Sequence, residues 1–181
     1  MSELFSIQLQ NRQQQGRDGV WLDLPTTTEQ VQAALRQIGI SSDNPQGLFI
    51  SGYFAEEEKR FAIPYNMVLA SNVDELNFMA ARLETLSAGE RAELNAALQA
   101  PQSELSSIGR ITDFPENVEY YVHLPDVRGP AQLGDYYLNR SGMVDMPEEW
   151  KGGIDTAQFG RYVAQQEQGA FTQYGYLVKS G

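Results

Sequence analysis

Hydrophobic and polar residues alternate near the start of the chain, as they do in a strand with one buried face. The segments FSIQLQ at 5–10 and GVWLDL at 19–24 both show this alternation, and Pro25 ends the second. A third segment, GLFISGYF at 47–54, is almost continuously apolar at its start. The pattern predicts three strands in the first third of the chain.

Between the second and third predicted strands, apolar residues recur every three or four positions, as they do on one face of a helix. Thr26 and Glu29 have the spacing of a capping box, in which each side chain bonds the other residue's backbone N–H at a helix start. Gly39 then suits the end of the helix. Between these limits one apolar stripe predicts the helix, formed by Val31, Ala34, Leu35 and Ile38.

Two further helices are predicted in the middle of the chain. Ser71 with Asp74 and Ser87 with Glu90 repeat the capping-box spacing, and Pro101 ends the second helix. Helices this short are marginal in water, so we expect them to pack on each other in a compact bundle. The expected buried stripes are Leu76, Met79, Ala80, Leu83 and Leu86 in the first helix and Leu94, Ala97 and Leu98 in the second.

Strands and helices return in the last third of the chain. We expect a strand at 118–124, then a helix that starts with Pro130 at its first position and ends at Gly142. Asp155 caps a further helix, and a terminal strand follows at 171–178. The residues expected to face inward from that helix are Phe159, Tyr162 and Val163.

These elements predict an α+β fold made of three small domains. Residues 1–63 form an N-terminal domain with a three-stranded sheet and a helix, and residues 64–110 form a central helical bundle. Residues 111–181 form a C-terminal domain with a small sheet and helices. A chain of 181 residues is long enough for this division.

The charge balance narrows the choice of partner. The chain carries 24 acidic against 13 basic residues, a net charge of −11, with an isoelectric point near 4.5. Nucleic acids and anionic membranes repel such a chain, whereas basic protein surfaces attract it. The carboxylates are spread along the chain rather than gathered in a tail. We therefore expect a basic protein partner, with no direct binding of nucleic acid or membrane.

The sequence lacks the signals of secretion. It contains no cysteine, which excludes disulfides, thiolate catalysis and cysteine metal sites. No apolar run is long enough to span a membrane, and the start, MSELFSIQLQNR, lacks the basic and apolar regions of a signal peptide. We expect a cytoplasmic protein.

Signatures of catalysis are scarce. His123 is the only histidine, which excludes a site with several histidines and favours a structural role. The three glutamates at 56–58 could hold a hard cation such as Ca²⁺, but Lys59 and Arg60 follow directly and favour a solvated loop. No phosphate-binding glycine motif is present. We expect no enzymatic activity, no cofactor and no metal.

Several carboxylates have a spacing that can be compared with DNA. B-DNA carries one negative charge per about 1.7 Å of its axis, and residues three or four apart on a helix lie about 5–6 Å apart at Cβ. Glu90 with Glu93 and Glu116 with Glu119 have this separation in sequence. A face of carboxylates can thus imitate a row of phosphates, although an ordinary solvated acidic face has the same spacing.

Three motifs give the chain a family resemblance. GVWLDLP at 19–25 and DELNFMAARLETL at 74–86 are similar to an N-terminal stretch and a central helix of the ArdA antirestriction family. LGDYYLNRSGMVDMPEEW at 133–150, followed by IDTAQFGRYV at 154–163, resembles the C-terminal pattern of the same family. That family is carried by conjugative plasmids and transposons. The resemblance covers nearly the whole chain in order.

The resemblance implies an elongated, non-enzymatic antirestriction protein of three small domains. Such a protein dimerises through its C-terminal part and imitates bent B-DNA. It occupies the DNA-binding groove of type I restriction-modification enzymes, which their DNA-recognition and methyltransferase subunits form. The region that matches the antirestriction motif is 143–156. The interface residues expected in it are Met143, Val144, Met146, Pro147 and Trp150.

The carboxylates expected to stand in for phosphates extend over all three predicted domains. They are Glu56, Glu57, Glu58, Asp74, Glu75, Glu84, Glu90, Glu93, Glu104, Asp113, Glu116 and Glu119. A second hypothesis is an acidic adaptor that binds another basic DNA-associated protein, such as a repressor. A third is a hydrolase or metal-dependent enzyme built on the carboxylates, which no motif favours.

Overall fold

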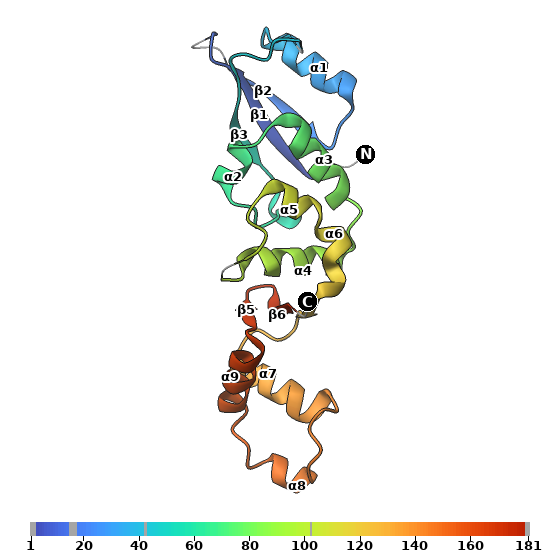
Figure 1. Cartoon of the computed structure of the whole chain (residues 1–181), viewed down its shortest axis with the longest axis vertical. Helices are drawn as coiled ribbons and strands as arrows, with labels where there is room; N and C mark the ends of the chain where they lie inside the picture. The colour runs from blue at the N-terminus through green and yellow to red at the C-terminus, as the bar shows by residue number, and fades with distance from the viewer. Residues whose placement is uncertain (1–2, 15–17, 42, 102, 180–181) are drawn as a thin grey trace. The chain divides into compact units, whose positions relative to one another are not determined.

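The computed structural model describes residues 3–14, 18–41, 43–101 and 103–179 (Figure 1). It is 47% helical and 19% strand, with two separate three-stranded sheets, which confirms the predicted α+β fold. The division into three domains, with limits at residues 63 and 110, remains a prediction. The chain separates into two compact units, the first formed by Met1–Leu86 with Leu105–Pro115 and the second by Ser87–Glu104 with Glu116–Gly181.

The sheet of the first unit has the strand order β2-β1-β3, with antiparallel neighbours. Ile7 and Leu9 on the central strand are fully buried on one face. A β-bulge between Gln8 and Leu9 interrupts the register of the central strand, β1, with β3. The strands lie where the alternation predicted them: β1 (Phe5–Asn11), β2 (Val20–Leu24) and β3 (Leu48–Phe54).

Helix α1 (Thr28–Gln37) begins one residue later than the capping-box spacing predicted. Its N-cap is Thr27, whose hydroxyl oxygen accepts a hydrogen bond from the Gln30 N–H at 3.2 Å. Thr26 is engaged elsewhere, because its N–H donates to the side-chain oxygen of Asn77 at 2.8 Å. Asn77 donates back to the Thr26 carbonyl at 3.1 Å. The prediction of Thr26 as the cap was therefore wrong, and this residue instead joins the sheet to a later helix.

Helix α3 (Val73–Leu83) shows the same displacement by one residue. Its N-cap is Asn72, whose side-chain oxygen accepts from the Glu75 N–H at 2.9 Å, so the predicted Ser71 cap was wrong. The Ser71 hydroxyl is buried, with no hydrogen-bond partner among the described residues. Asparagine caps a helix as well as serine does, so spacing alone could not choose between these neighbours. The buried stripe is the predicted one: Leu76, Met79, Ala80 and Leu83.

Several short helical segments follow the third strand, and the last of them extends past the end of the first unit at Pro115. The segment expected as an exposed loop after the third strand contains a 3-10 turn, Glu57–Lys59. Ile111 and Phe114 are completely buried, which indicates that packing rather than local propensity forms the short helices around them. These helices are α2 (Tyr65–Leu69), α5 (Ile108–Thr112) and α6 (Phe114–Asn117).

The second unit begins with α4 (Ala88–Gln99), where the predicted capping box is confirmed. The Ser87 hydroxyl oxygen accepts from the Glu90 N–H at 3.2 Å, and the Glu90 carboxylate accepts from the Ser87 N–H at 3.0 Å. Leu94 and Ala97 are buried, as the predicted stripe requires.

The sheet of the second unit has the order β4-β6-β5 and is antiparallel. The strand predicted at 118–124 is correct only in its second half, because Val118–Tyr120 form a 3-10 turn. The single strand predicted at 171–178 was wrong, since this segment is a hairpin. Gly175 at its turn has a φ of +120°, a conformation that side chains disfavour. The strands are β4 (Tyr121–Leu124), β5 (Ala170–Thr172) and β6 (Gly175–Lys179).

Helices α7 and α9 lie side by side in the second unit, and both were predicted (Figure 1). Asp155 caps α9 by accepting hydrogen bonds from the Ala157 and Gln158 N–H groups, at 3.0 and 3.1 Å. The last part of the predicted 130–142 helix is a π-helical turn, Tyr136–Arg140. The helices of this region are α7 (Pro130–Asp135), α8 (Glu148–Lys151) and α9 (Thr156–Glu167).

One residue of α9 that was expected to face the core faces solvent instead. Val163 packs against the core as predicted, but Tyr162 is 60% exposed, so its predicted inward orientation was wrong. Neighbouring residues on an α-helix are separated by about 100°, so Tyr162 and Val163 cannot both point to the centre of one narrow stripe. The buried core of this region consists of Val127, Leu133, Ala164 and Tyr176.

Candidate interaction surfaces

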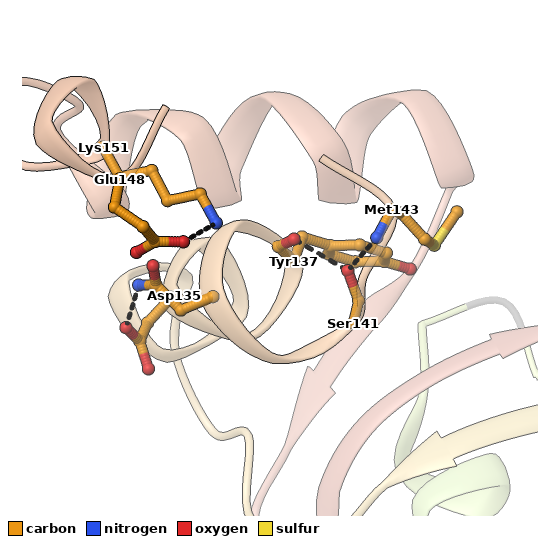
Figure 2. A network of polar contacts seen from close by, with 7 residues as sticks. Asp135, Tyr137, Ser141, Met143, Glu148 and Lys151 are labelled. Atoms are coloured by element: carbon orange, nitrogen blue, oxygen red, sulfur yellow. Dashed lines mark hydrogen bonds and ion pairs between the residues drawn. The ribbon is translucent and has the colours of Figure 1, made fainter. Parts of the chain in front are cut away.

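The segment that carries the predicted antirestriction motif leaves the π-helical turn through a polar network (Figure 2). The Ser141 hydroxyl donates to the Tyr137 carbonyl at 2.7 Å and accepts from the Met143 N–H at 3.1 Å. Between them Gly142 has a φ of +74°, a left-handed conformation that glycine adopts without strain. These contacts fix the direction of the chain as it leaves the helix, and with it the backbone position of Met143.

Charged side chains lie before this segment and within it (Figure 2). Before it, the Asp135 carboxylate accepts from the Asn139 side chain at 2.8 Å and lies 3.8 Å from Arg140. Within it, Lys151 Nζ lies 2.9 Å from Glu148 Oε1 on the same helix. The Lys151 side chain is only 13% exposed, whereas the Glu148 side chain that it contacts is 83% exposed.

Glu167, the last residue of α9, joins the helices of the second unit to its sheet. One carboxylate oxygen accepts from the Tyr137 hydroxyl, and the other accepts from the Tyr176 hydroxyl at 2.6 Å. Burial raises the pKa of both tyrosines, and the bonds to Glu167 raise it further. Both phenols therefore stay neutral donors at ordinary pH. The Glu167 carboxylate on α9 therefore connects the π-helical turn, which precedes the motif segment, with β6.

Large apolar side chains of the motif are exposed to solvent. Met143 is 74% exposed and Trp150 is 64% exposed. Exposed apolar side chains mark a protein–protein interface where they gather in one patch. Ile154 and Tyr162, which the sequence prediction missed as surface residues, are exposed as well, and both lie within the IDTAQFGRYV motif that could have indicated them. Of the other predicted interface residues, Pro147 is exposed, and Val144 and Met146 are partly buried.

Most of the carboxylates predicted to imitate phosphates are exposed, and both units carry them. Seven of the twelve belong to the first unit and five to the second. The exposed ones are Glu56, Glu57, Glu58, Asp74, Glu75, Glu104, Asp113, Glu116 and Glu119, and the partly buried ones are Glu84, Glu90 and Glu93.

Glu90 and Glu93 differ in their electrostatics although they lie one turn apart on α4. Hydrogen bonds from the Ser87 backbone and hydroxyl lower the pKa of Glu90. Burial, and then the negative charge of Glu90, raise the pKa of Glu93 to about 7. Glu93 therefore titrates near neutral pH. Its contribution to the negative surface depends on pH.

Two of the predicted carboxylates contact a lysine. Glu56 Oε2 lies 3.9 Å from Lys59 Nζ, and the Glu104 carboxylate contacts Lys179 Nζ. The side chains of both pairs are well exposed to solvent, and exposed pairs contribute little stability. A competing basic surface can therefore displace these lysines at small cost.

Metal chemistry and membrane insertion find no support in the residues that the structure describes. These residues contain no group of three or more histidine, cysteine or acidic side chains placed to hold a metal ion. Every helix among them is too short or too polar to traverse a bilayer. His123 has a structural position, because its Nε2 lies 2.8 Å from the Tyr174 carbonyl oxygen and connects β4 with the hairpin turn.

Comparison with known proteins supports the resemblance that the motifs gave. The family model described as antirestriction protein (ArdA) matches residues 15–178 of the chain. That range includes all the motifs on which the resemblance rests. No curated protein matches the chain. Since the match covers nearly its whole length, the chain belongs to the ArdA family of antirestriction proteins, a family of inhibitors rather than of known enzymes.

Proposed function

We propose that the protein is a dimeric acidic mimic of DNA that occupies the DNA-binding groove of type I restriction-modification enzymes and so blocks restriction. Its carboxylates stand in for phosphates and meet the lysines and arginines with which the DNA-recognition and methyltransferase subunits hold DNA. The site of action is the cytoplasm of a cell that receives a conjugative element. Incoming unmodified DNA then escapes cleavage.

The exposure of carboxylates in both units is the observation that carries this proposal. Nine of the twelve predicted carboxylates are exposed, and the chain has a net charge of −11. A groove lined with basic residues attracts such a surface over long range and raises the rate of association. Because the charge is distributed, the proposal gives no single carboxylate an essential role.

The apolar residues of the motif support dimerisation through the second unit. Met143 and Trp150 are large, apolar and exposed, whereas such side chains gain free energy when they are buried. A two-fold symmetric contact brings the same patch of each copy together. Two copies of −11 then make a dimer of net charge −22, which offers a basic groove more negative surface than one copy does.

A restriction-protection assay tests the proposal. A type I enzyme is mixed with an unmodified plasmid that carries its recognition sites, at low salt, and the purified protein is added in increasing amounts. We expect cleavage to stop as the protein exceeds the enzyme, and protection to weaken as salt is added, because salt screens charge pairs. A restriction enzyme of another type, acting on the same plasmid, serves as the control.

The same assay separates this proposal from the adaptor hypothesis. Full cleavage in the presence of a large excess of protein at low salt would refute inhibition of type I enzymes. Tight binding to a different basic DNA-associated protein under those conditions would then favour the adaptor.

A further inference from the structure

Trp21 lies on the face of the first sheet that points away from the core, and half of its surface is exposed. The register places it beside Gln8 of β1, which pairs in turn with Gly52 of β3. A Cβ atom on Gly52 would lie 3.1 Å from Cη2 at the far edge of the indole ring. The ring therefore extends across β1 and covers the glycine, whose missing side chain makes room for it.

Phe54 lies on the same face, one row away from Trp21. The register aligns Asp23, Ser6 and Phe54 across the three strands. Phe54 is 56% exposed, so two large aromatic rings face solvent on one small sheet. Exposed rings beside a concave surface are typical of a binding site. The open groove between them measures about 360 Å³ and is lined by Ser6, Trp21, Tyr53 and Phe54.

The rim of this groove is acidic. The Ser6 hydroxyl donates to Asp23 Oδ1 at 2.5 Å. The Glu3 and Asp23 carboxyl groups are in contact, and their hydrogen bond and mutual repulsion raise the pKa of Glu3. Phe54 also lines a neighbouring hollow together with Glu3 and Glu56. Three carboxylates therefore lie around one edge of the exposed aromatic surface.

The two cations near Phe54 have partners of their own. Lys59 Nζ lies 3.4 Å from the Glu3 carbonyl oxygen and 3.9 Å from the Glu56 carboxylate. Arg60 donates to the Ala55 carbonyl at 3.1 Å.

Charge and chemistry select among the possible occupants. A second copy of the chain carries the same net charge of −11, and nucleic acid brings phosphates, so carboxylates at the rim disfavour both. A cationic side chain is favoured instead. The planar guanidinium group of arginine stacks on an aromatic ring and also donates hydrogen bonds to a carboxylate, whereas a lysine ammonium is a point charge.

We propose that the aromatic–acidic groove, lined by Ser6, Trp21, Tyr53 and Phe54 with Asp23 at its rim, binds an arginine-bearing segment of a basic protein partner. The guanidinium group stacks against Trp21 and Phe54 and donates to the Asp23 carboxylate. The first unit then binds its partner through stacking and a directed hydrogen bond as well as through net charge. That this partner is a type I restriction-modification enzyme rests on the proposed function, whereas the chemistry of the groove does not.

Tryptophan fluorescence reports on the groove directly. The chain has two tryptophans, so Trp150→Phe leaves Trp21 as the only one. This variant is titrated with the peptide Gly-Arg-Gly-Arg-Gly, blocked at both ends, and with the same peptide carrying glutamine at both arginine positions. We expect a saturable change in Trp21 emission with the arginine peptide, and a response at least about fivefold weaker with the glutamine peptide.

Two substitutions in the same background connect that signal to the groove. Phe54→Ser and Asp23→Asn should each weaken the arginine response by about fivefold, while circular dichroism shows that the fold is kept. Phe78→Ser is the matched control, because Phe78 is an exposed aromatic residue of the same unit on α3. An equal response to both peptides would overturn the inference, as would a response indifferent to Phe54 and Asp23. A tighter response to a single-stranded oligonucleotide would overturn it too.

The protection assay then tests the partner. With Trp150 intact, Phe54→Ser should require several times more protein for half-protection, and Phe78→Ser should behave as the parent does. If the parent gives no protection at all, the proposed function fails, and the peptide titration still decides whether the groove binds arginine. If the parent protects but the peptides bind alike, the groove inference fails alone.

Discussion

Gly160 of α9 and Pro130 of α7 are in backbone contact: a Cβ atom on Gly160 would lie 1.7 Å from the Pro130 carbonyl oxygen. The relationship is repeated along the helix pair, because a Cβ atom on Gly134 would lie 1.9 Å from the Thr156 carbonyl oxygen. Side chains cannot occupy either position at this separation. The two glycines therefore set how closely the helices that flank the motif segment approach each other.

The substitution Gly160→Ala should force α7 and α9 apart. The added methyl group meets rigid backbone rather than a movable side chain, so we expect the free energy of unfolding to fall by about 3 kcal/mol, as in an overpacked core. Chemical denaturation monitored by circular dichroism measures this change. Gly152→Ala is the matched control, since nothing lies within 4 Å of a Cβ atom there. Equal stability of the two variants would contradict the close approach.

The substitution Glu167→Ala should lower the free energy of unfolding, because it breaks the link between the π-helical turn, α9 and β6. It removes the acceptor for the hydroxyl groups of Tyr137 and Tyr176, and Tyr176 is completely buried. A buried donor left without a partner costs about 1–3 kcal/mol, so we expect a loss of roughly 3 kcal/mol for the pair. Glu167→Gln keeps one acceptor oxygen and should lose about half as much. Denaturation midpoints of the three proteins check this order.

Two helix starts were predicted only to within one residue, because two competent caps stand next to each other at each of them. Thr26 and Thr27 stand side by side, as do Ser71 and Asn72, and each of the four residues is a competent cap. Tertiary contacts, such as the bonds between Thr26 and Asn77, decide which neighbour is used. The Ser87 capping box had no such competitor and was predicted correctly.

Features formed by long-range contacts were beyond sequence reasoning. The short helices around Phe114 are formed by burial, and local spacing gives no sign of them. Trp21 and Phe54 lie far apart in sequence, and only the register of β2, β1 and β3 brings their rings to one face. The predicted motif segment, in contrast, could be proposed from sequence because its residues are contiguous. The exposure of Met143 and Trp150 within it required the structure.

Glu93 should make stability depend on pH. Its pKa is about 7 in the folded protein and near the ordinary glutamate value of 4.5 in the unfolded chain, so the folded state binds a proton more tightly. The resulting stabilisation is complete below about pH 4.5 and is lost as pH rises through 7. Glu93→Gln should therefore be equal to the parent at low pH and more stable above pH 7. The gain should be about 1 kcal/mol, because a partly exposed group is screened by solvent.

Urea denaturation of parent and Glu93→Gln across this pH range measures the effect. Glu57→Gln, at an exposed position of the other unit, controls for the loss of one negative charge. A difference between Glu93→Gln and the parent that stays constant with pH would show that Glu93 does not titrate near neutrality.

Met143→Ser and Trp150→Ser should weaken dimerisation. Both side chains are exposed in one copy of the chain, so their loss costs little folding free energy. If they meet a second copy, each substitution should raise the dimer dissociation constant by tenfold or more, as expected for a large apolar interface residue. Sedimentation over a range of protein concentrations gives that constant. Phe78→Ser removes a similarly exposed aromatic side chain outside the motif and should leave the dimer dissociation constant unaltered. A parent protein that stays monomeric at high concentration would rule out the proposed dimer.

Neutralising carboxylates together should reduce protection far more than neutralising them singly. Glu57→Gln alone should alter the protein concentration for half-protection by less than about twofold, because one exposed charge contributes little. The combined change of Glu56, Glu57 and Glu58 to Gln and of Asp74 to Asn should raise that concentration by tenfold or more and flatten its dependence on salt. The matched control exchanges each Glu for Asp and Asp74 for Glu, which keeps all four charges. Equal losses in the neutral and the charge-conserving variants would show that shape at these positions matters and their charge does not.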